Sequence, residues 1–393
     1  MAISVRRRKE GSGPLSAWLI SLVAILCVLA LGILFSAFFF FKTPTATSLE
    51  YVRGALTGAT STPATPTLDK QAYDKKLLEI AYATTSITAQ QVLVFEGLAS
   101  STTGATSTSA TSTVKKLPTS IWPVHAPYPE YGALLPFNRI VAYYGNFYST
   151  AMGVLGEYPQ DQVLQKLQTA AAQWQAADPS TPVIPAIDYI AVTAQGSAGA
   201  DGKYRLRMPD SQIDKAVQMA NSVHGIVILD VQVGLSSVET EVPLLQKYLS
   251  MPNVHLALDP EFAMQTSGAR PGTVIGTLDA KDINWAVNYL ATLVTANNLP
   301  PKILIIHRFT EGMVTNYKQI TPLPQVQIVM DMDGWGFPAK KINTYEYVIA
   351  PEPVDFTGFK LFYKADLTPP STRLLTPAEV LSLKPQPVFI QYQ

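Results

Sequence analysis

The sequence predicts an α/β protein: a (β/α)8 TIM barrel preceded by a single transmembrane helix and a Ser/Thr/Pro-rich stalk. Three observations predict it. A long uncharged apolar run follows a basic N-terminus, a low-complexity region comes next, and after Pro136 short apolar runs alternate with longer amphipathic stretches. At 393 residues the chain is longer than one average domain and can bury a sizeable core.

The charge and cysteine content exclude several classes of protein. With 29 basic and 29 acidic residues the formal net charge is zero, so no overall field attracts the chain to nucleic acid or to anionic lipid. The single cysteine, Cys27, lies inside the apolar run. An intrachain disulfide and a cysteine-ligated structural zinc site are therefore excluded.

The apolar run covers residues 15–41 and contains no charged side chain. About 20 apolar residues span a bilayer, so the run is long enough to cross one. A basic cluster at residues 6–9 precedes it, which by the positive-inside rule leaves the N-terminus in the cytoplasm. We expect residues 1–42 to form a cytoplasmic basic tip and a single-pass anchor in the cell membrane, with the rest of the chain outside the cytoplasm.

Two alternatives for this run are a cleaved signal peptide and a lipidated Cys27. The apolar region of a signal peptide is about 7–15 residues long and ends in small residues. This run is longer and ends in phenylalanines at residues 38–41. Leu26 is larger than the small residue expected before a lipidated cysteine. An uncleaved anchor is the favoured interpretation.

Residues 43–135 have the composition of a stalk. The tracts 57–67 and 100–113 are too polar to bury a core and read as flexible linkers. Between them, residues 68–98 place apolar side chains at helical spacing. This segment is either a docking helix or a spacer that lifts the following domain off the membrane, and the spacer is favoured.

Residues 136–393 are predicted to form the barrel. Short apolar runs alternating with amphipathic stretches are typical of repeated βα units and a parallel sheet. The predicted strands are residues 139–144, 183–190, 225–232, 254–261, 302–308, 326–333, 357–363 and 388–392. The predicted helices are residues 160–177, 210–222, 237–249, 280–297 and 339–348.

The count of strands and the domain length fit a barrel. Asp210 and Asp279 are placed where helix N-caps belong, the first helix is expected against the second strand, and the last strand beside the first. The rival is an open doubly wound sheet. Such a sheet would carry a Gly-rich phosphate turn after its first strand, and Tyr144-Gly145-Asn146 is not one.

Acids concentrate at the predicted strand ends, where barrel active sites form. The second to sixth strands supply, in order, Asp188; Asp230 and Gln232; Asp259 and Glu261; His307 and Arg308; Asp331 and Asp333. Residues two apart on a strand share a face, so these pairs can point together into the barrel mouth. A lone aspartate at a strand end commonly caps a helix or closes a turn. Acids from at least four strands at one height indicate a site, because burying carboxylates without a task is costly.

Aromatic residues gather at the same ends, where they either stack on sugar rings or simply pack. These aromatics are Tyr143, Tyr144, Phe147, Tyr148, Tyr189, Phe262, Trp335, Phe337, Tyr363 and Tyr392. The predicted substrate-binding residues are Tyr144, Asp188, Tyr189, Gln232, His307, Arg308, Trp335, Tyr363 and Tyr392. The loops 193–204 and 265–277 are expected to rim the cleft.

The opening of the barrel and two short motifs carry a resemblance to a known group. The barrel opens with Val141-Ala142-Tyr143-Tyr144-Gly145, its fourth strand ends Asp259-Pro260-Glu261, and its sixth reads Met330-Asp331-Met332-Asp333. These motifs resemble those of glycoside hydrolase barrels, and of family 18 chitinase-like proteins in particular. Ala257 and Val254 stand where that family has earlier acids, and Met332 where it often has tyrosine. The resemblance implies that Glu261 is a general acid acting on a carbohydrate.

Glycoside hydrolysis needs a protonated acid and a second carboxylate that attacks the anomeric carbon or activates water. Glu261 is the predicted acid, with Asp259 below it raising its pKa by like-charge repulsion. Asp230, Asp331 and Asp333 are the candidates for the second role. Retention and inversion both stay open. His307 and Arg308 are expected to bind hydroxyls or orient a carboxylate, and His307 has the equal alternative of a core histidine.

Two other functions stay open. A metal-dependent hydrolase would use Asp188, Asp230, His307 and Asp331 as ligands, although the His-x-His pair frequent on the first strand of such barrels is absent. A catalytically inactive barrel that binds a glycan or a cell-envelope partner is the other. The favoured prediction is a hydrolase with no cofactor and no metal, a carbohydrate ligand, membrane contact through residues 15–41, and no nucleic-acid partner.

Overall fold

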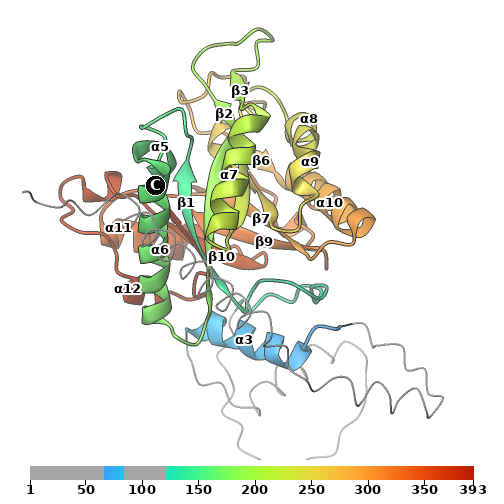
Figure 1. The fold of residues 1–393 in the computed structure, drawn as a ribbon, viewed down its shortest axis with the longest axis vertical. Helices are drawn as coiled ribbons and strands as arrows, with labels where there is room; N and C mark the ends of the chain where they lie inside the picture. The colour runs from blue at the N-terminus through green and yellow to red at the C-terminus, as the bar shows by residue number, and fades with distance from the viewer. Residues whose placement is uncertain (1–65, 84–120) are drawn as a thin grey trace, which may run out of the picture. The chain divides into compact units, whose positions relative to one another are not determined.

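The computed structural model describes residues 66–83 and 121–393. Eight parallel strands close into a barrel, because β1 pairs on one side with β2 and on the other with β11. In order around the barrel the strands are β1 (Arg139–Gly145), β2 (Val183–Ala194), β4 (Ile226–Val231), β5 (Val254–Leu258), β7 (Lys302–Arg308), β9 (Val326–Met332), β10 (Phe356–Leu361) and β11 (Phe389–Tyr392). The predicted (β/α)8 barrel is confirmed, and the open sheet is excluded (Figure 1).

Two strand ends differ from the prediction for local reasons. β2 runs past residue 190 to Ala194 and pairs there with the short antiparallel β3 (Arg205–Arg207). β5 stops at Leu258, because Pro260 begins a 3-10 turn, Pro260–Phe262, in place of further strand. That turn sets the direction of Glu261.

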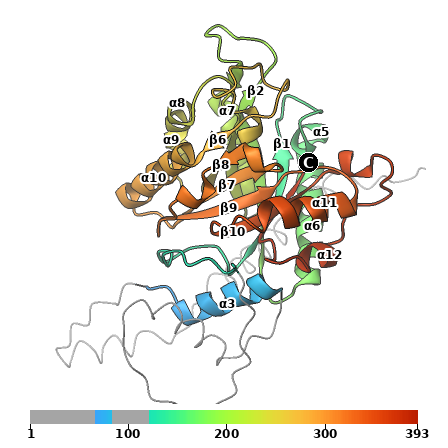
Figure 2. The same ribbon diagram turned by 180° about the vertical axis from the view of Figure 1, so that it is seen from behind.

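Helices cover the outside of the barrel (Figures 1 and 2). They are α5 (Val154–Glu157), α6 (Gln160–Ala177), α7 (Asp210–Ser222), α8 (Val238–Glu241), α9 (Gln246–Leu249), α10 (Ala280–Asn297), α11 (Pro338–Thr344) and α12 (Pro377–Leu381). The helix predicted at residues 237–249 is divided by a 3-10 turn, Val242–Leu245, that contains Pro243. The helix predicted at 339–348 becomes α11 followed by a π-helical turn, Tyr345–Ile349. Between β7 and β9 lie only 3-10 turns and β8 (Val314–Thr315), which pairs with β6 (Leu278–Asp279).

The two predicted helix caps have different outcomes. Asp279 caps α10 in a capping box, its side chain accepting from the backbone N–H of Lys281. The Asp210 prediction is wrong: Pro209 occupies the cap position of α7 and Asp210 is its first residue. There the Asp210 carboxylate accepts from Lys247 Nζ at 3.0 Å, and its negative charge suits the helix N-terminus.

Inward positions along the strands change in character from start to end. At the strand starts they are mostly apolar and form one core, which includes Ile140, Ala186, Ile228 and Val329, with His255 and Gln327 as buried polar exceptions. A second core lies between the outward strand faces and the helices. At the strand ends the inward positions are polar, so the barrel interior has an apolar floor and a charged upper layer.

Helix α3 (Lys70–Tyr82) packs on the apolar core at the strand starts. Tyr73 is buried there, with its ring edge-on to Tyr128 and Phe137. Tyr128 Oη donates to Asp74 at 2.6 Å, and the backbone N–H of Gln386 donates to the carbonyl of Ile80 at 2.8 Å. A helix therefore forms within residues 68–98 and packs on the barrel. From the sequence alone, a spacer is favoured over such a docking helix.

The predicted anchor, residues 15–41, lies outside the described residues, as do both low-complexity tracts apart from 66 and 67. In the part of the chain that the structure describes, no helix is both long and apolar enough to cross a membrane.

Candidate functional site

A cleft of about 330 Å³ opens at the C-terminal ends of the strands. Six of the predicted site residues line it: Tyr144, Gln232, Asp259, Glu261, Asp333 and Trp335. Four others, Asp188, Asp230, His307 and Asp331, are fully buried in the layer of charged residues within the barrel. Strand alternation explains this arrangement, since all of these strand residues continue the inward-facing positions of the apolar floor.

His307 is the centre of the buried layer. Its Nε2 lies 3.2 Å from Oδ2 of Asp230, and its Nδ1 lies 3.1 Å from Oδ2 of Asp331. Burial lowers the pKa of His307, but hydrogen bonding to Asp230 and Asp331 and the charges of Asp230 and Asp333 raise it more, so the net pKa lies well above the ordinary value. The surroundings of the imidazole therefore favour its protonated, cationic form.

Asp188 and Asp230 form a second feature of this layer. Asp188 Oδ2 accepts from Gln391 Nε2 at 2.5 Å, while Asp230 contacts His307 through its Oδ2 and has its Oδ1 buried without a hydrogen-bond partner. Burial first, and the charge of Asp230 second, raise the pKa of Asp188 well above its ordinary range. The shift favours the neutral form of Asp188, and that form reduces the negative charge under the cleft.

Asp259 and Glu261 stand at the end of β5. Asp259 Oδ2 accepts from Gln232 Nε2 at 3.2 Å, and its Oδ1 accepts from the backbone N–H of Glu261 at 3.2 Å. Burial and the charge of Asp230 raise the pKa of Asp259 well above its ordinary range. Asp259 is therefore a buried support that fixes the turn from which Glu261 projects.

Glu261 is half-buried in the cleft. Burial first, and the negative charge of Asp333 second, raise its pKa. The direction is the predicted one, but the neighbouring carboxylate that raises it is Asp333 rather than Asp259. A glutamic acid that keeps its proton at higher pH suits a proton donor.

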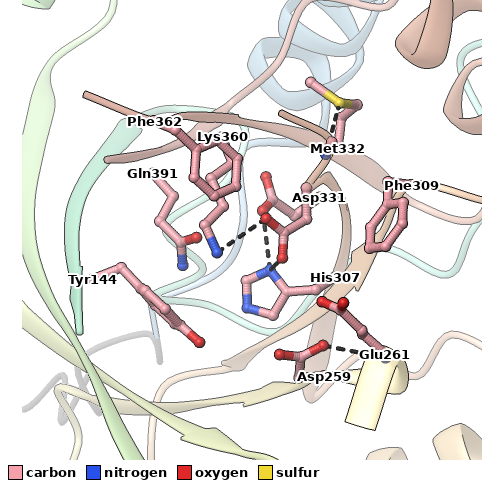
Figure 3. A network of polar contacts seen from close by, with 12 residues as sticks. Tyr144, Asp259, Glu261, His307, Phe309, Asp331, Met332, Lys360, Phe362 and Gln391 are labelled. Carbon is pink, nitrogen blue, oxygen red and sulfur yellow. Dashed lines mark hydrogen bonds and ion pairs between the residues drawn. The ribbon is translucent and has the colours of Figure 1, made fainter. Parts of the chain in front are cut away.

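The sequence did not single out Lys360, an inward-facing residue of β10. Its Nζ lies 3.0 Å from Oδ1 of Asp333 and 3.9 Å from the centre of the Tyr144 ring. Figure 3 shows Lys360, Tyr144, His307, Asp259 and Glu261 pointing toward one space. A lysine between apolar residues in a predicted strand was the available signal, because alternation puts it on the face opposite Phe359 and Leu361. Gln391 of β11 was missed in the same way.

Four predicted binding residues do not reach the cleft, and this corrects the prediction. Tyr189, Arg308, Tyr363 and Tyr392 occupy outward positions, one residue out of step with the inward face. Tyr189 stacks on Phe147 with ring centres 4.7 Å apart. Tyr363 and Tyr392 stack on each other with ring centres 5.0 Å apart. Arg308 pairs with Glu352 and donates to two backbone carbonyls.

The four residues proposed as metal ligands, Asp188, Asp230, His307 and Asp331, contact other side chains in the structure. Both ring nitrogens of His307 face carboxylates, as described above. Within residues 66–83 and 121–393, no group of three or more His, Cys, Asp or Glu side chains has an arrangement that would hold a metal ion.

No protein-family model matches the chain, and no curated protein matches it in sequence. Among solved structures, it is similar to a family 5 xyloglucan-specific endo-β-1,4-glucanase from a metagenomic library, in complex with cellotriose. The TM-score is 0.35 and the identity 13%, with 63% of this chain and 81% of that chain covered. A ruminal family 26 endo-β-1,4-mannanase gives a TM-score of 0.31 and 10% identity over 65% of this chain and 59% of that chain. A family 18 chitinase from Pseudoalteromonas aurantia gives a TM-score of 0.22 and 12% identity, over 59% of this chain and 69% of that chain.

At TM-scores below 0.5 these likenesses carry no weight for the chemistry of the cleft. The architecture rests on the closed set of eight parallel strands. The chain thus has a (β/α)8 barrel fold.

Proposed function

We propose that the barrel binds a glycan in this cleft and hydrolyses a glycosidic bond, with Glu261 as the general acid and Asp333 as the second carboxylate. One observation carries the proposal. The cleft is lined by a glutamic acid whose pKa is raised and by a carboxylate paired with a cation. Glycoside hydrolysis requires a carboxyl group whose protonated form is favoured and a second carboxylate beside it.

Asp333 is chosen from the three candidates for the second role by its position. Asp230 and Asp331 are fully buried and hold His307. Asp333 lines the cleft and has a small exposed surface. A carboxylate that attacks an anomeric carbon or activates water must be reachable from the substrate side.

A carbohydrate ligand is supported by the walls of the cleft. Trp335 is 53% exposed, although it lines the cleft, and its indole ring has Lys340 Nζ 4.5 Å from its centre. Phe309 and Phe362 also line the cleft. An exposed aromatic face beside hydrogen-bonding carboxyl and amide groups suits a sugar ring, which has apolar C–H faces and a polar edge.

The test uses the purified full chain in detergent, beside Glu261→Gln, Asp333→Asn and the exposed control Glu346→Gln. Each protein is incubated with a panel of storage and cell-envelope polysaccharides, and released reducing ends are measured. Release by the wild type and the control that disappears in Glu261→Gln and Asp333→Asn supports the proposal. If Glu261→Gln releases as much sugar as the wild type, Glu261 is not the general acid. If no protein releases sugar while all bind the same glycan equally, the barrel is a binding module.

We also propose that residues 15–41 anchor the protein in the cell membrane with the barrel outside the cytoplasm. The uncharged run after the basic cluster at residues 6–9 supports this orientation. Protease added to intact cells should digest the barrel while a tag at the N-terminus stays protected. Release of the full-length chain by a carbonate wash would contradict an anchor.

A further inference from the structure

Lys360 is a costly residue to bury, and it belongs to the cleft itself. Only 2% of its surface is exposed, and its neighbours in sequence, Phe359 and Leu361, face the outer core. Burying an ammonium group in a barrel costs several kcal/mol in desolvation unless it is paired. Its pairing partner is therefore the first clue to its role.

Three neighbours fix the position of the ammonium group. Nζ lies 3.0 Å from Oδ1 of Asp333, 3.9 Å from the ring centre of Tyr144 and 5.1 Å from that of Phe362. Burial lowers the pKa of Lys360, but Asp333 and Asp259 raise it more, and the net shift is upward. The group is thus a permanent cation at one point between the ends of β1 and β9.

Asp333 and Glu261 have different surroundings although both line the cleft. Asp333 has Lys360 on Oδ1, and His307 Nδ1 lies 3.6 Å from its Oδ2. Among the described residues, Glu261 has no cationic group within ion-pair distance; the charges of Lys360 and His307 lower its pKa, but burial and Asp333 raise it more. The charged and titratable groups around this pair are Tyr144 on β1, Asp188 on β2, Asp230 on β4, Asp259 at the end of β5, His307 on β7, Asp331 on β9 and Lys341 on α11.

We propose that Lys360 is a positioning residue: it clamps Asp333 beside Tyr144 and keeps it a carboxylate, so that Asp333 and Glu261 take opposite roles in the reaction. This inference rests on the proposed hydrolysis for its catalytic part. The clamp itself concerns the charge state of Asp333 and is measured without substrate.

The first measurement follows the protonation of Asp333 in the full chain labelled with ¹³C at aspartate Cγ, with Asp333→Asn used to assign the signal. Lys360→Met removes the charge and keeps the length, Lys360→Arg keeps the charge, and Lys281→Met is an exposed control. In Lys360→Met the midpoint of the Asp333 titration should rise by about one pH unit or more, because a cation within about 4–6 Å no longer favours the carboxylate. Lys360→Arg and Lys281→Met should leave it near the wild-type position.

The second measurement is the pH dependence of kcat on a polysaccharide that the wild type hydrolyses. In Lys360→Met the acidic limb should move to higher pH by as much as the Asp333 titration moves. Lys360→Arg should restore the position of the limb. An effect on folding alone would lower kcat without moving the limb.

The outcomes separate the two proposals. An unmoved Asp333 titration in Lys360→Met overturns the clamp, whatever the activity. A moved titration in a protein that hydrolyses nothing keeps the clamp and removes the hydrolase proposal. A moved titration with an unchanged pH profile in an active enzyme overturns the catalytic role of Lys360. Should Lys360→Met fail to fold, judged by circular dichroism, Lys360→Gln takes its place.

Discussion

Gly358 on β10 leaves the space that the carboxylate of Asp331 on β9 occupies. A Cβ built on Gly358 would lie 2.5 Å from Oδ1 of Asp331 and 2.9 Å from Cδ1 of Phe389. The two residues are cross-strand partners, and Asp331 is one of the two carboxylates that hold His307. The glycine is therefore part of what places the charged layer inside the barrel.

Gly358→Ala should destabilise the protein. An added methyl group in a packed core costs about 1–3 kcal/mol, and here it displaces a buried carboxylate as well. Urea unfolding of the full chain, followed by tryptophan fluorescence, measures the loss. Gly312→Ala is the matched control, because a Cβ there meets nothing within 4 Å. Equal stability of the two variants would show that Asp331 moves aside without cost.

His255 gives the protein a pH-dependent stability. Burial first, and Lys302 second, lower the pKa of His255 well below its ordinary value, and its Nδ1 accepts from the backbone N–H of Ile303 at 3.0 Å. In the unfolded state the histidine pKa is about 6.5. Between this pH and the lowered pKa of the folded state, the unfolded state therefore binds a proton at His255 and the folded state does not. Stability is fully present above about pH 6.5 and is lost as the pH falls toward the lowered pKa, at up to about 1.4 kcal/mol per pH unit.

His255→Asn keeps an acceptor and cannot take up the proton. Measured by urea unfolding between pH 5 and pH 8, the wild type should lose free energy of unfolding relative to this variant as the pH drops below about 6.5. The exposed His224, changed to Asn, should leave the wild-type pH dependence intact. A constant difference between wild type and His255→Asn across this range would refute the assignment.

Tyr73 should link α3 to the stability of the barrel. Its ring is only 5% exposed and packs in the core at the strand starts. Tyr73→Ala should lower the free energy of unfolding by about 3–5 kcal/mol, as for other large buried aromatics. Lys75→Ala, on the exposed side of α3, should change it by less than about 0.5 kcal/mol. A Tyr73→Ala protein as stable as the wild type would mean that α3 adds nothing to the fold.

The pH dependence of hydrolysis should report Glu261. Because its pKa is raised by burial and by Asp333, Glu261 should keep its proton above the ordinary glutamic acid value of about 4.3. Activity should persist above that pH and fall as the pH rises through the raised pKa. Rates measured from pH 4 to pH 9 test this, with Glu346→Gln as the control of unchanged profile. A fall centred at or below about 4.3 would assign the proton donor to another group.

The strand pattern was readable from the sequence because it is local. Each predicted strand overlaps an observed one, and α6, α7 and α10 begin and end at the predicted residues. Periods of two and of 3.6 residues are set by neighbours within a few positions. Pro243 and Pro260 moved element boundaries, because a proline ring removes a backbone donor and favours a turn.

The gathering of acids was also predictable, because parallel strands present their ends on one side of a barrel. Side-chain alternation along the predicted strands places Glu261 and Asp333 on the inward face, and both line the cleft. The same rule, applied to Tyr189, Arg308, Tyr363 and Tyr392, points outward. Their aromatic or charged side chains fit a binding role, but their place in the alternation does not.

The sequence by itself determined the order of strands and helices, the barrel they imply and the inward row of carboxyl groups, since all three follow from periodicity along the chain. Only the tertiary structure decided which partners meet across strands distant in sequence. Strand pairing brought Lys360 to Asp333 and His307 between Asp230 and Asp331, and packing of α3 placed Tyr73 in the core at the strand starts. These contacts set burial and charge around each group, and pKa depends on that surrounding rather than on residue type.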